Sequence, residues 1–459
     1  MKLINKLLIS LGLTAAAAGA LSAQNTTAGY FLDDYMYRFQ MNPAMANSKG
    51  FVSMPGIGNL NIGFNGNLHL KNVLYNVNGR TTTFLHPEVS ASEVLGNLKD
   101  MNNFNSNIKV NVLTAGFKGF GGYNTINIGV RADIGLHLPK SIFSLLKEGV
   151  SNNNYEIDGM RAFGNSYAEI ALGHSHDLPV PGLRIGGAVK VLVGIANIDA
   201  QFNRASLNLG VDDWSILANA DVRTRMKGFT YDTKRSEHTH NMYVNGANVD
   251  GAGVGGFGLA FDLGATYTLP FYNDVTVSVG LLDLGFIKWD NDMLASTNGD
   301  KTFNTDRYTF NADDDAPNSF KRTKDQIVDD ISALYELENM GDQGGVTTPL
   351  GATLNIGAEY KFPLYRKLSF GLLNTTRIQK GFGWTNFRLS ANVAPVKVFD
   401  ASVSVAGGTY GFSFGWLANI HMPGFNLFVG MDHTTSKLAK QGVPLSSNAQ
   451  VNFGLNFPF

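Results

Sequence analysis

The chain has 459 residues, with 36 lysines and arginines against 37 aspartates and glutamates, so its formal net charge is −1. This balance gives no basic surface of the kind that nucleic-acid binding requires, and nucleic acid is excluded as a partner. No cysteine is present, which excludes disulfides, thiol catalysis and cysteine metal sites. Hydrophobic residues make up 44% of the chain although the mean hydropathy is only −0.05. Membrane barrels combine the two in this way, because polar lumen residues dilute the apolar residues that face lipid.

Residues 1–23 have the pattern of a secretory signal peptide. Lys2 and Lys6 form a basic start, residues 7–20 form the apolar core, and Leu21-Ser22-Ala23 supplies the small residues of a cleavage site. The apolar run is too short to span a membrane. No later stretch approaches 18 consecutive apolar residues, so we expect no transmembrane helix.

The next stretch, residues 24–56, does not alternate like a barrel strand. Pro43 rules out a central strand position, and asparagine before proline favours a turn. We expect this stretch to form a hatch in the lumen or on the periplasmic side. An ordinary periplasmic extension is the alternative. The residues that we expect to line an internal, ligand-binding pocket are Tyr30, Phe31, Tyr35, Phe39, Asn42, Pro43 and Ala44.

With Asn42-Pro43-Ala44 between a signal peptide and the first strand, the chain resembles the FadL-type family of outer-membrane barrels and its PorV-like relatives. It looks most like an uncharacterised Bacteroidota outer-membrane barrel family with this layout. The resemblance implies an N-terminal hatch inside the barrel. In FadL-like proteins it further implies uptake of hydrophobic compounds, an outer groove built by loop helices, and sideways release through the wall. PorV-like relatives instead serve as accessory barrels in secretion and assembly.

From residue 57 to residue 459 the sequence alternates with period two, which predicts strands with one apolar and one polar face. Val275, Val277 and Val279 alternate with Thr276 and Ser278, for example. Strands are expected at 57–70, 108–119, 123–137, 164–178, 183–201, 257–270, 274–288, 348–362, 367–379, 384–395, 398–408, 410–421, 424–435 and 447–459. The fold class is therefore all-β, a transmembrane antiparallel β-barrel of about 14 strands with an N-terminal hatch and helical extracellular loops.

Loop lengths support this strand order. The long links 71–107, 138–163, 202–256 and 289–347 are the first, third, fifth and seventh connections. Links between them are short, as periplasmic turns are when both chain ends lie in the periplasm. One question stays open, namely whether 203–231 belongs to a loop or forms an extra hairpin in the wall.

The long links also contain helix signals. Ser90 with Glu93 forms a capping box, Pro139 can start a helix that Gly149 ends, and Thr323 is expected to cap a helix over 323–340. Their apolar faces either pack on one another and the rim or dock a protein partner.

The final stretch closes the predicted cylinder. Phe453, Leu455, Phe457 and Phe459 share one face and alternate with polar residues. This pattern resembles the C-terminal signature of bacterial outer-membrane proteins. It implies insertion by the barrel-assembly machinery and contact with outer-membrane lipid.

No catalytic arrangement stands out, so no enzyme activity, cofactor or metal is expected. The GxGxxG match at 251–256 opens a strand, which argues against dinucleotide binding. His174 and His176 are expected to face outward near the periplasmic interface. Glu169 and Arg388 are expected to face the lumen.

Two functions follow from these expectations. The first is uptake of a small hydrophobic compound through a hatch-plugged barrel in the outer membrane of a Gram-negative bacterium. The second is an accessory barrel that docks protein partners through its loop helices.

Overall fold

The computed structural model describes residues 26–149, 154–210, 213–251, 253–309, 311, 315–434 and 449–459. The predicted signal peptide, residues 1–23, lies outside them. Across these ranges, no helix combines the length and apolar character needed to cross a membrane.

Fourteen antiparallel strands form a closed barrel, which confirms the predicted fold class. Each strand pairs with the next along the chain, and the last pairs with the first. The ring consists of β1 (Phe51–Ser53) with β2 (Asn59–Gly66), β5 (Met101–Gly119), β6 (Gly122–Pro139), β8 (Arg161–Asp177), β9 (Leu183–Leu209), β13 (Gly256–Thr268), β14 (Val275–Trp289), β18 (Val346–Pro349) with β19 (Ala352–Lys361), β20 (Leu368–Ile378), β21 (Trp384–Val396), β22 (Phe399–Gly408), β23 (Gly411–Met422), β24 (Phe425–Thr434) and β25 (Ala449–Pro458).

Side chains alternate across the wall as the period of two requires. On β25, Val451 and Phe453 are 38% and 37% exposed on the outer face, whereas Asn452 between them is fully buried on the lumen face. Phe457 is exposed on the same side as Phe453, and Phe459 follows the strand with its backbone N–H donating to the carbonyl of Gly50. The outer face of the barrel is therefore apolar and the inner face polar.

The first wall strand begins earlier than expected. Residues 24–56 were expected to lie outside the barrel wall, but β1 (Phe51–Ser53) pairs with both β25 and β5. After an interruption at residues 54–58, β2 continues between the same two neighbours. Pro55 and Gly56, whose φ is +75°, lie in this interruption, since a proline cannot donate to the ladder.

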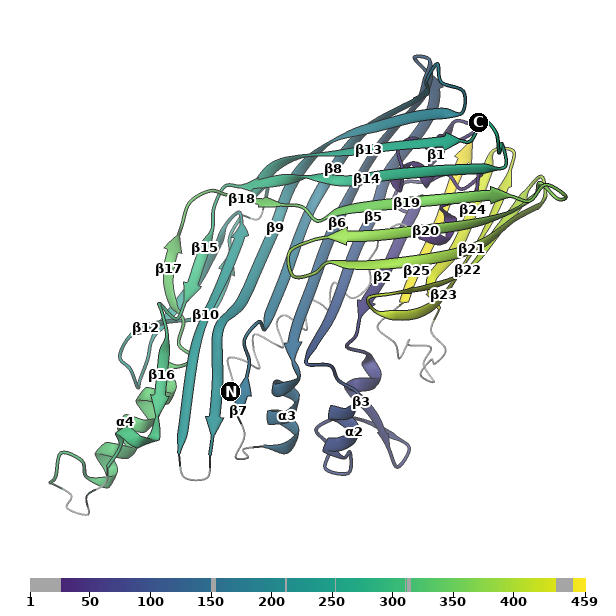
Figure 1. Ribbon diagram of the computed structural model, residues 1–459. Helices are drawn as coiled ribbons and strands as arrows, with labels where there is room; N and C mark the ends of the chain where they lie inside the picture. The colour runs from purple at the N-terminus through teal and green to yellow at the C-terminus, as the bar shows by residue number, and fades with distance from the viewer. Residues whose placement is uncertain are drawn as a thin grey trace.

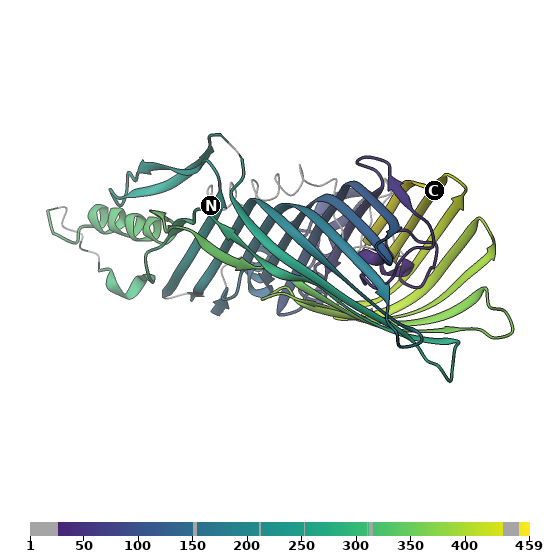
Figure 2. The same ribbon diagram turned by 90° about the horizontal axis from the view of Figure 1, so that it is seen from above.

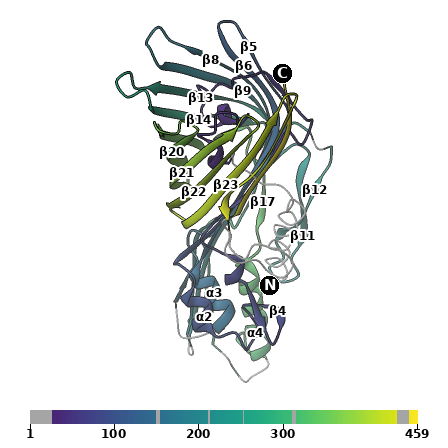
Figure 3. The ribbon, with the colours of Figure 1, turned by 90° about the vertical axis from the view of Figure 1, so that its right-hand side faces the viewer.

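The two ends of the barrel differ as the loop lengths indicate. Short turns lie at one end, and the connections that contain α2 (Ala91–Gly96), α3 (Lys140–Glu148) and α4 (Phe320–Ala333) gather at the opposite end (Figures 1 and 3). We call these the short-turn end and the outer end.

A second sheet region extends from the outer end. β9 is 27 residues long; residues 183–194 pair with β13 and residues 196–209 pair with β10 (Trp214–Met226). Most of the described part of 203–231 therefore belongs to the hairpin of β9 and β10, which continues the sheet beyond the closed ring (Figure 2). Further strands complete this region: β7 (Asn154–Glu156), β11 (Phe229–Arg235), β12 (Met242–Val249), β15 (Met293–Ser296), β16 (Lys301–Asn304) and β17 (Glu338–Asp342).

The helices α2 and α3 cover each other. The Ser90 hydroxyl accepts a hydrogen bond from the backbone N–H of Glu93 (3.2 Å), as the capping box predicts. Val94 and Phe143, one from each helix, belong to one buried cluster. Residues of β3 (Leu74–Val77) and residues on either side of the turn η3 (Leu70–Asn72) also pack on it, and β3 forms a hairpin with β4 (Arg80–Thr83). The apolar faces of both helices are thus used inside the protein.

The position of α4 differs from the prediction of 323–340. The helix runs from Phe320 to Ala333 with Ser319 as its N-cap, and it follows the 3-10 turn η4 (Thr305–Arg307). Thr323 lies inside the first turn instead, where its hydroxyl donates to the carbonyl of Thr309 (3.1 Å). The N-cap is thus Ser319, four residues before the predicted one, although its side chain makes no capping hydrogen bond.

Candidate functional site in the barrel lumen

Residues 26–50, which we call the lumen segment, fold inside the ring of strands as a series of turns (Figure 2). Its regular elements are two 3-10 turns, η1 (Thr27–Gly29) and η2 (Arg38–Gln40). Residues 28–32 and 35–45 are all buried. The segment contributes no strand to the wall, so the ring of strand pairings closes without it.

Asp432 on β24 holds the start of the lumen segment. Its carboxylate accepts four hydrogen bonds, from the Thr26 hydroxyl (2.7 Å), the Thr27 backbone N–H (2.6 Å) and hydroxyl (2.6 Å), and the Ala28 backbone N–H (2.7 Å). Arg388 lies beside it and donates to the backbone carbonyl of Asp432 (3.0 Å). Two of the donors are N–H groups at the start of η1. The Asp432 carboxylate therefore acts as a helix cap that comes from the wall strand β24.

Asn42 fixes the middle of the lumen segment to the wall. Its side-chain Nδ2 donates to the backbone carbonyls of Ala265 (3.2 Å) and Val279 (3.1 Å), on adjacent strands. Its Oδ1 accepts from the backbone N–H of Ala44 (3.0 Å), which closes a turn around Pro43. The Asn-Pro-Ala motif is thus a turn that bonds the wall through one amide.

Glycines form the surface on which the lumen segment rests. A Cβ atom on any of five wall glycines would come within 3.1 Å of an atom of the segment. Three of them are directly paired across β9, β13 and β14, which removes side chains from one continuous patch of wall. The five are Gly186, Gly264, Gly280, Gly357 and Gly371. The close approach of the segment therefore depends on residues without side chains.

The aromatic residues of the segment form a packed core. The Tyr30 and Phe31 rings meet edge to face at 4.8 Å, and the Tyr30 hydroxyl lies 3.0 Å from the Ser278 hydroxyl. Tyr35 packs against Phe428 of β24 at 5.0 Å. The four aromatic residues, Tyr30, Phe31, Tyr35 and Phe428, belong to one buried hydrophobic cluster. Tyr37, Phe39 and Phe51 are also members. In this state the predicted pocket residues contact one another and the wall.

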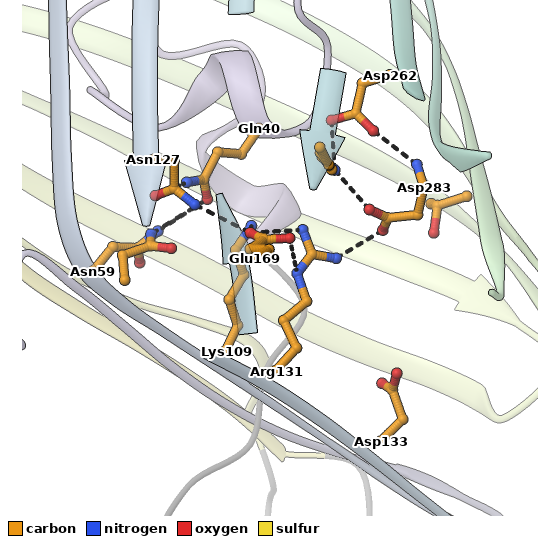
Figure 4. Close-up of polar contacts among 12 residues, drawn as sticks. Gln40, Asn59, Lys109, Asn127, Arg131, Asp133, Glu169, Asp262 and Asp283 are labelled. Carbon is orange, nitrogen blue, oxygen red and sulfur yellow. Dashed lines mark hydrogen bonds and ion pairs between the residues drawn. The ribbon is translucent and has the colours of Figure 1, made fainter. Parts of the chain in front are cut away.

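A group of paired charges lies in the lumen beside the segment (Figure 4). Arg131 lies between two carboxylates, 2.8 Å from Glu169 and 2.8 Å from Asp283. Lys190 bridges Asp262 and Asp283, at 2.6 Å from each. Lys109 is 4.0 Å from Glu169, and Arg377 is 3.7 Å from Asp133. Each of these four basic residues is thus within ion-pair distance of a carboxylate.

Asp283 occupies a bulge in β14. Its φ is +59°, a conformation that residues with side chains rarely adopt. The pairing of β13 with β14 shifts at this point, so that Leu282 and Asp283 are both buried. The bulge adds one carboxylate to the lumen face, where Arg131 and Lys190 reach it.

Gln40 connects the lumen segment to these charges. Its Nε2 donates to Oδ1 of Asn127 (3.2 Å), and its Oε1 accepts from Asn111 (3.4 Å) and Asn59 (3.5 Å). Asn127 in turn donates to Oε1 of Glu169 (3.1 Å). A movement of the segment at Gln40 would therefore reach the charged group through one amide.

The cavities that the structure describes beside Lys109 and Arg131 are small. One, of about 30 Å³, includes Phe39 and Pro43 in its lining, and another, of about 60 Å³, includes Met41. Each has room for one or a few water molecules. The described cavities beside the segment are therefore too small for a ligand larger than a few water molecules.

A loop crosses the lumen nearer the outer end. Phe382, between β20 and β21, reaches β6 and β8 on the opposite side of the ring. Its ring centroid is 4.1 Å from that of His137 and 5.6 Å from that of Phe163. The Arg161 guanidinium lies 5.5 Å from the Phe382 ring, and a Cβ atom on Gly135 would be 2.3 Å from it. Glycine in the wall again permits the contact.

Three histidines, His174, His176 and His238, lie away from the paired charges of the lumen. His174 and His176 lie on the outer face with their ring centroids 5.3 Å apart, alternating with the buried Ser175. His238 is 3.3 Å from Asp329 of α4 at the outer end. Among the residues whose placement is described, no group of three or more histidines, aspartates or glutamates could hold a metal ion.

Two predicted lumen residues, Glu169 and Arg388, are 1% and 3% exposed. Both are engaged by wall residues: Glu169 with Arg131, and Arg388 with the Ser404 hydroxyl (2.6 Å) and Asp432. Sequence reasoning missed Asp432, Asp283 and Phe382. The period of β24 places Asp432 inward, whereas Asp283 faces the lumen only because of the bulge and Phe382 lies between two strands. Only the three-dimensional structure shows where the last two point.

Comparison of the fold with solved structures gives similar barrels at low sequence identity. A FadL homologue from Pseudomonas aeruginosa is 10% identical, with 96% of this chain and 99% of that chain covered and a TM-score of 0.41. The toluene transporter TodX from Pseudomonas putida is 7% identical, with 96% and 94% covered and a TM-score of 0.37. The translocator domain of the autotransporter NalP from Neisseria meningitidis is 9% identical, with 96% and 99% covered and a TM-score of 0.35.

Comparison of the sequence gives one family. No protein with a curated description matches the chain. The model of the family of unknown function DUF5723 matches residues 43–432, from the proline of the Asn-Pro-Ala motif to the carboxylate that anchors the lumen segment. The match covers most of the chain, and the protein therefore belongs to the family of unknown function DUF5723.

Proposed function

We propose that the protein is an outer-membrane channel in which the lumen segment acts as a hatch, and that it takes up a small, predominantly apolar compound. One observation carries the proposal. The segment fills the lumen through side-chain contacts, such as those of Asn42 and Asp432, while the ring of strands closes without it. It can therefore leave its position without opening the barrel wall.

The ligand class follows from what the lumen offers. The charges around Arg131 and Lys190 are paired with carboxylates, so they leave no surplus charge of one sign to select an ion. Tyr30, Phe31 and Phe39 are the apolar surface that a ligand would contact as the segment moves. A small neutral compound fits this combination better than an ion does.

The proposed location is the outer membrane of a Gram-negative bacterium, after cleavage of residues 1–23. Support comes from the apolar outer face of the barrel and from its C-terminal strand, where Val451, Phe453 and Phe457 face outward. We further propose that the barrel-assembly machinery inserts the chain through this strand.

A reversible tether tests the hatch. Thr26 and Asp432 touch through their side chains at 2.7 Å, and the chain has no cysteine of its own, so the double variant T26C/D432C can form one unique disulfide across the contact. Entry of the apolar dye N-phenyl-1-naphthylamine into cells that express the variant is followed by fluorescence. We expect dye entry under reducing conditions and a fall of at least about tenfold after oxidation, because the covalent bond holds the segment in place.

The two single-cysteine variants serve as controls, since neither can form the bond. Equal dye entry in the oxidised and reduced double variant, with the disulfide verified by mass, would contradict a moving hatch. The barrel fold is checked in every sample by the heat-dependent mobility of folded barrels on a gel.

A docking role is the second candidate, and α4 is the observation that favours it. Phe320, Val328 and Tyr335 are 65%, 36% and 40% exposed, whereas α2 and α3 bury their apolar faces on each other. If this surface binds a protein, deletion of residues 320–333 should reduce the mass of the particle extracted from its own membrane in mild detergent. A particle that contains a single chain before and after the deletion argues against the docking role.

A further inference from the structure

A groove of about 440 Å³ runs across the outside of the barrel wall between β13 and β21. Its lining is almost entirely apolar and comes from five neighbouring strands: Ala265, Thr266, Tyr267, Val277, Ser278, Val279, Ile356, Gly357, Ala358, Leu372, Asn374 and Phe387. The volume lies within the range of about 300–1,000 Å³ that is usual for small-molecule sites.

The groove faces the membrane and not the lumen. Ile356, Leu372 and Phe387 are 50%, 53% and 57% exposed. Their neighbours along each strand point the other way; Asn355 and Arg388, for example, are buried in the lumen. Since the surface around the groove is the apolar face of a transmembrane barrel, the material that meets it is the hydrocarbon of the bilayer.

Side-chain size shapes the groove. Ala265 and Ala358 are small residues set among Ile356, Leu372 and Phe387, which stand up as its sides. Strand pairing places Tyr267, Val277, Ala358 and Leu372 in one row across β13, β14, β19 and β20. At a spacing of about 4.8 Å between strands, the crossing from β13 to β21 is about 19 Å long. This length is comparable to the thickness of one leaflet of hydrocarbon, about 15 Å, and therefore to that of an extended acyl chain.

The floor of the groove is braced from the inside. Ser278 and Gly357 belong to the floor, and on the lumen side the Tyr30 hydroxyl lies 3.0 Å from that of Ser278. Ala265 and Val279 also line the groove. Their backbone carbonyls accept hydrogen bonds from Asn42 on the lumen side. The concavity is thus held in shape before any ligand arrives, which lowers the entropic cost of binding.

We propose that this groove binds one acyl chain of a membrane phospholipid. The choice of a lipid follows from its position, because it is continuous with the lipid-facing surface and its lining offers one amide, that of Asn374. Both oxygen and nitrogen of that amide are engaged by the neighbouring Thr376 and Thr385 hydroxyls. The inference concerns the outer face of the wall while the lumen segment is docked, with Tyr30 and Asn42 bracing the groove from inside.

The test compares two tryptophan substitutions on the lipid-facing surface. A358W fills the groove from outside and touches no lumen residue. V403W places the same side chain on β22, where Val403 is 61% exposed and lies outside the groove. Each protein is exchanged into nanodiscs of phosphatidylethanolamine that carries a photoactivatable diazirine in its acyl chain, irradiated, and digested for mass spectrometry.

We expect cross-links in the wild type and in V403W to concentrate on peptides of β13, β14 and β19, and to fall by at least about tenfold in A358W. Lipid retained after delipidation should follow the same order in native mass spectrometry. An even spread of cross-links around the barrel, an unchanged yield in A358W, or a second copy of the chain covering the groove would each overturn the proposal.

Discussion

Replacing Asp432 with asparagine is expected to release the start of the lumen segment while the barrel stays folded. The carboxylate accepts four hydrogen bonds from Thr26, Thr27 and Ala28. An amide offers one acceptor oxygen, and its NH₂ group would face the Thr27 N–H, a second donor. Hydrogen bonds to charged groups contribute about 1.5–3 kcal/mol each, and removing one partner of a buried charged contact costs about 3–5 kcal/mol.

Hydrogen exchange separates this effect from global unfolding. The Tyr30 amide, which donates to Thr27 at the start of the segment (3.1 Å), should lose protection by about 100-fold or more, since 1.4 kcal/mol is a factor of ten. Amides of β25 should keep their protection because the ring closes without the segment. D300N is the matched control, since Asp300 pairs with Arg204 at the outer end, far from the segment in the chain. Unchanged protection at Tyr30 would mean that contacts other than those of Asp432 hold the start of the segment.

The wall of the barrel was predictable because each strand carries its own evidence. The alternation of Val275, Val277 and Val279 predicts a strand without any knowledge of its neighbours, and β14 begins at Val275. Loop parity then fixed the order of the strands. The pattern could not place β1, because three residues, Phe51–Ser53, are too few to show a period. It also could not tell the hairpin of β9 and β10 from wall, because that hairpin is a sheet with the same period.

The contacts inside the lumen were not predictable in the same way. Asp432 and Thr26 are separated by 406 residues, and Arg131 and Asp283 by 152. Period two indicates that Asp432 faces inward but not which charges it meets, and the bulge that turns Asp283 inward breaks the period. The Asn-Pro-Ala motif that begins at Asn42 could be recognised in the sequence. The hydrogen-bond partners of Asn42 could not, because they are backbone carbonyls, which have no sequence signature. The glycines that seat it could not be chosen from the 52 in the chain.

Two separate contacts hold the lumen segment to the wall. Asp432 holds the segment at its first residues and Asn42 holds it at its middle, so the two contacts act on opposite ends of the stretch that contains Tyr30 and Phe31. Releasing one end leaves the other attached. A hatch held at two points can rotate within the lumen when one contact breaks. It would then turn about the contact that remains, either that of Asp432 or that of Asn42.

Adding a single methyl group at Gly264 is expected to displace the middle of the lumen segment. In G264A the new Cβ atom would lie 2.0 Å from Oδ1 of Asn42, 2.9 Å from Cδ of Pro43 and 3.0 Å from the backbone N of Ala44. The wall cannot yield, because β13 is paired on both sides at this position. Overpacking costs about 1–3 kcal/mol, and here the cost falls on the docked state of the segment and not on the ring.

The measurement is ion conductance through single barrels in a planar bilayer. If the docked segment closes the lumen, its loss of about 1–3 kcal/mol should raise the open fraction roughly 5- to 150-fold. G407A is the matched control, because no atom lies within 4 Å of a Cβ atom built on Gly407. Equal open fractions in G264A and the wild type would show that the docked segment is not what closes the lumen. The closure would then have to lie at Phe382, whose ring crosses the lumen to His137 independently of the segment.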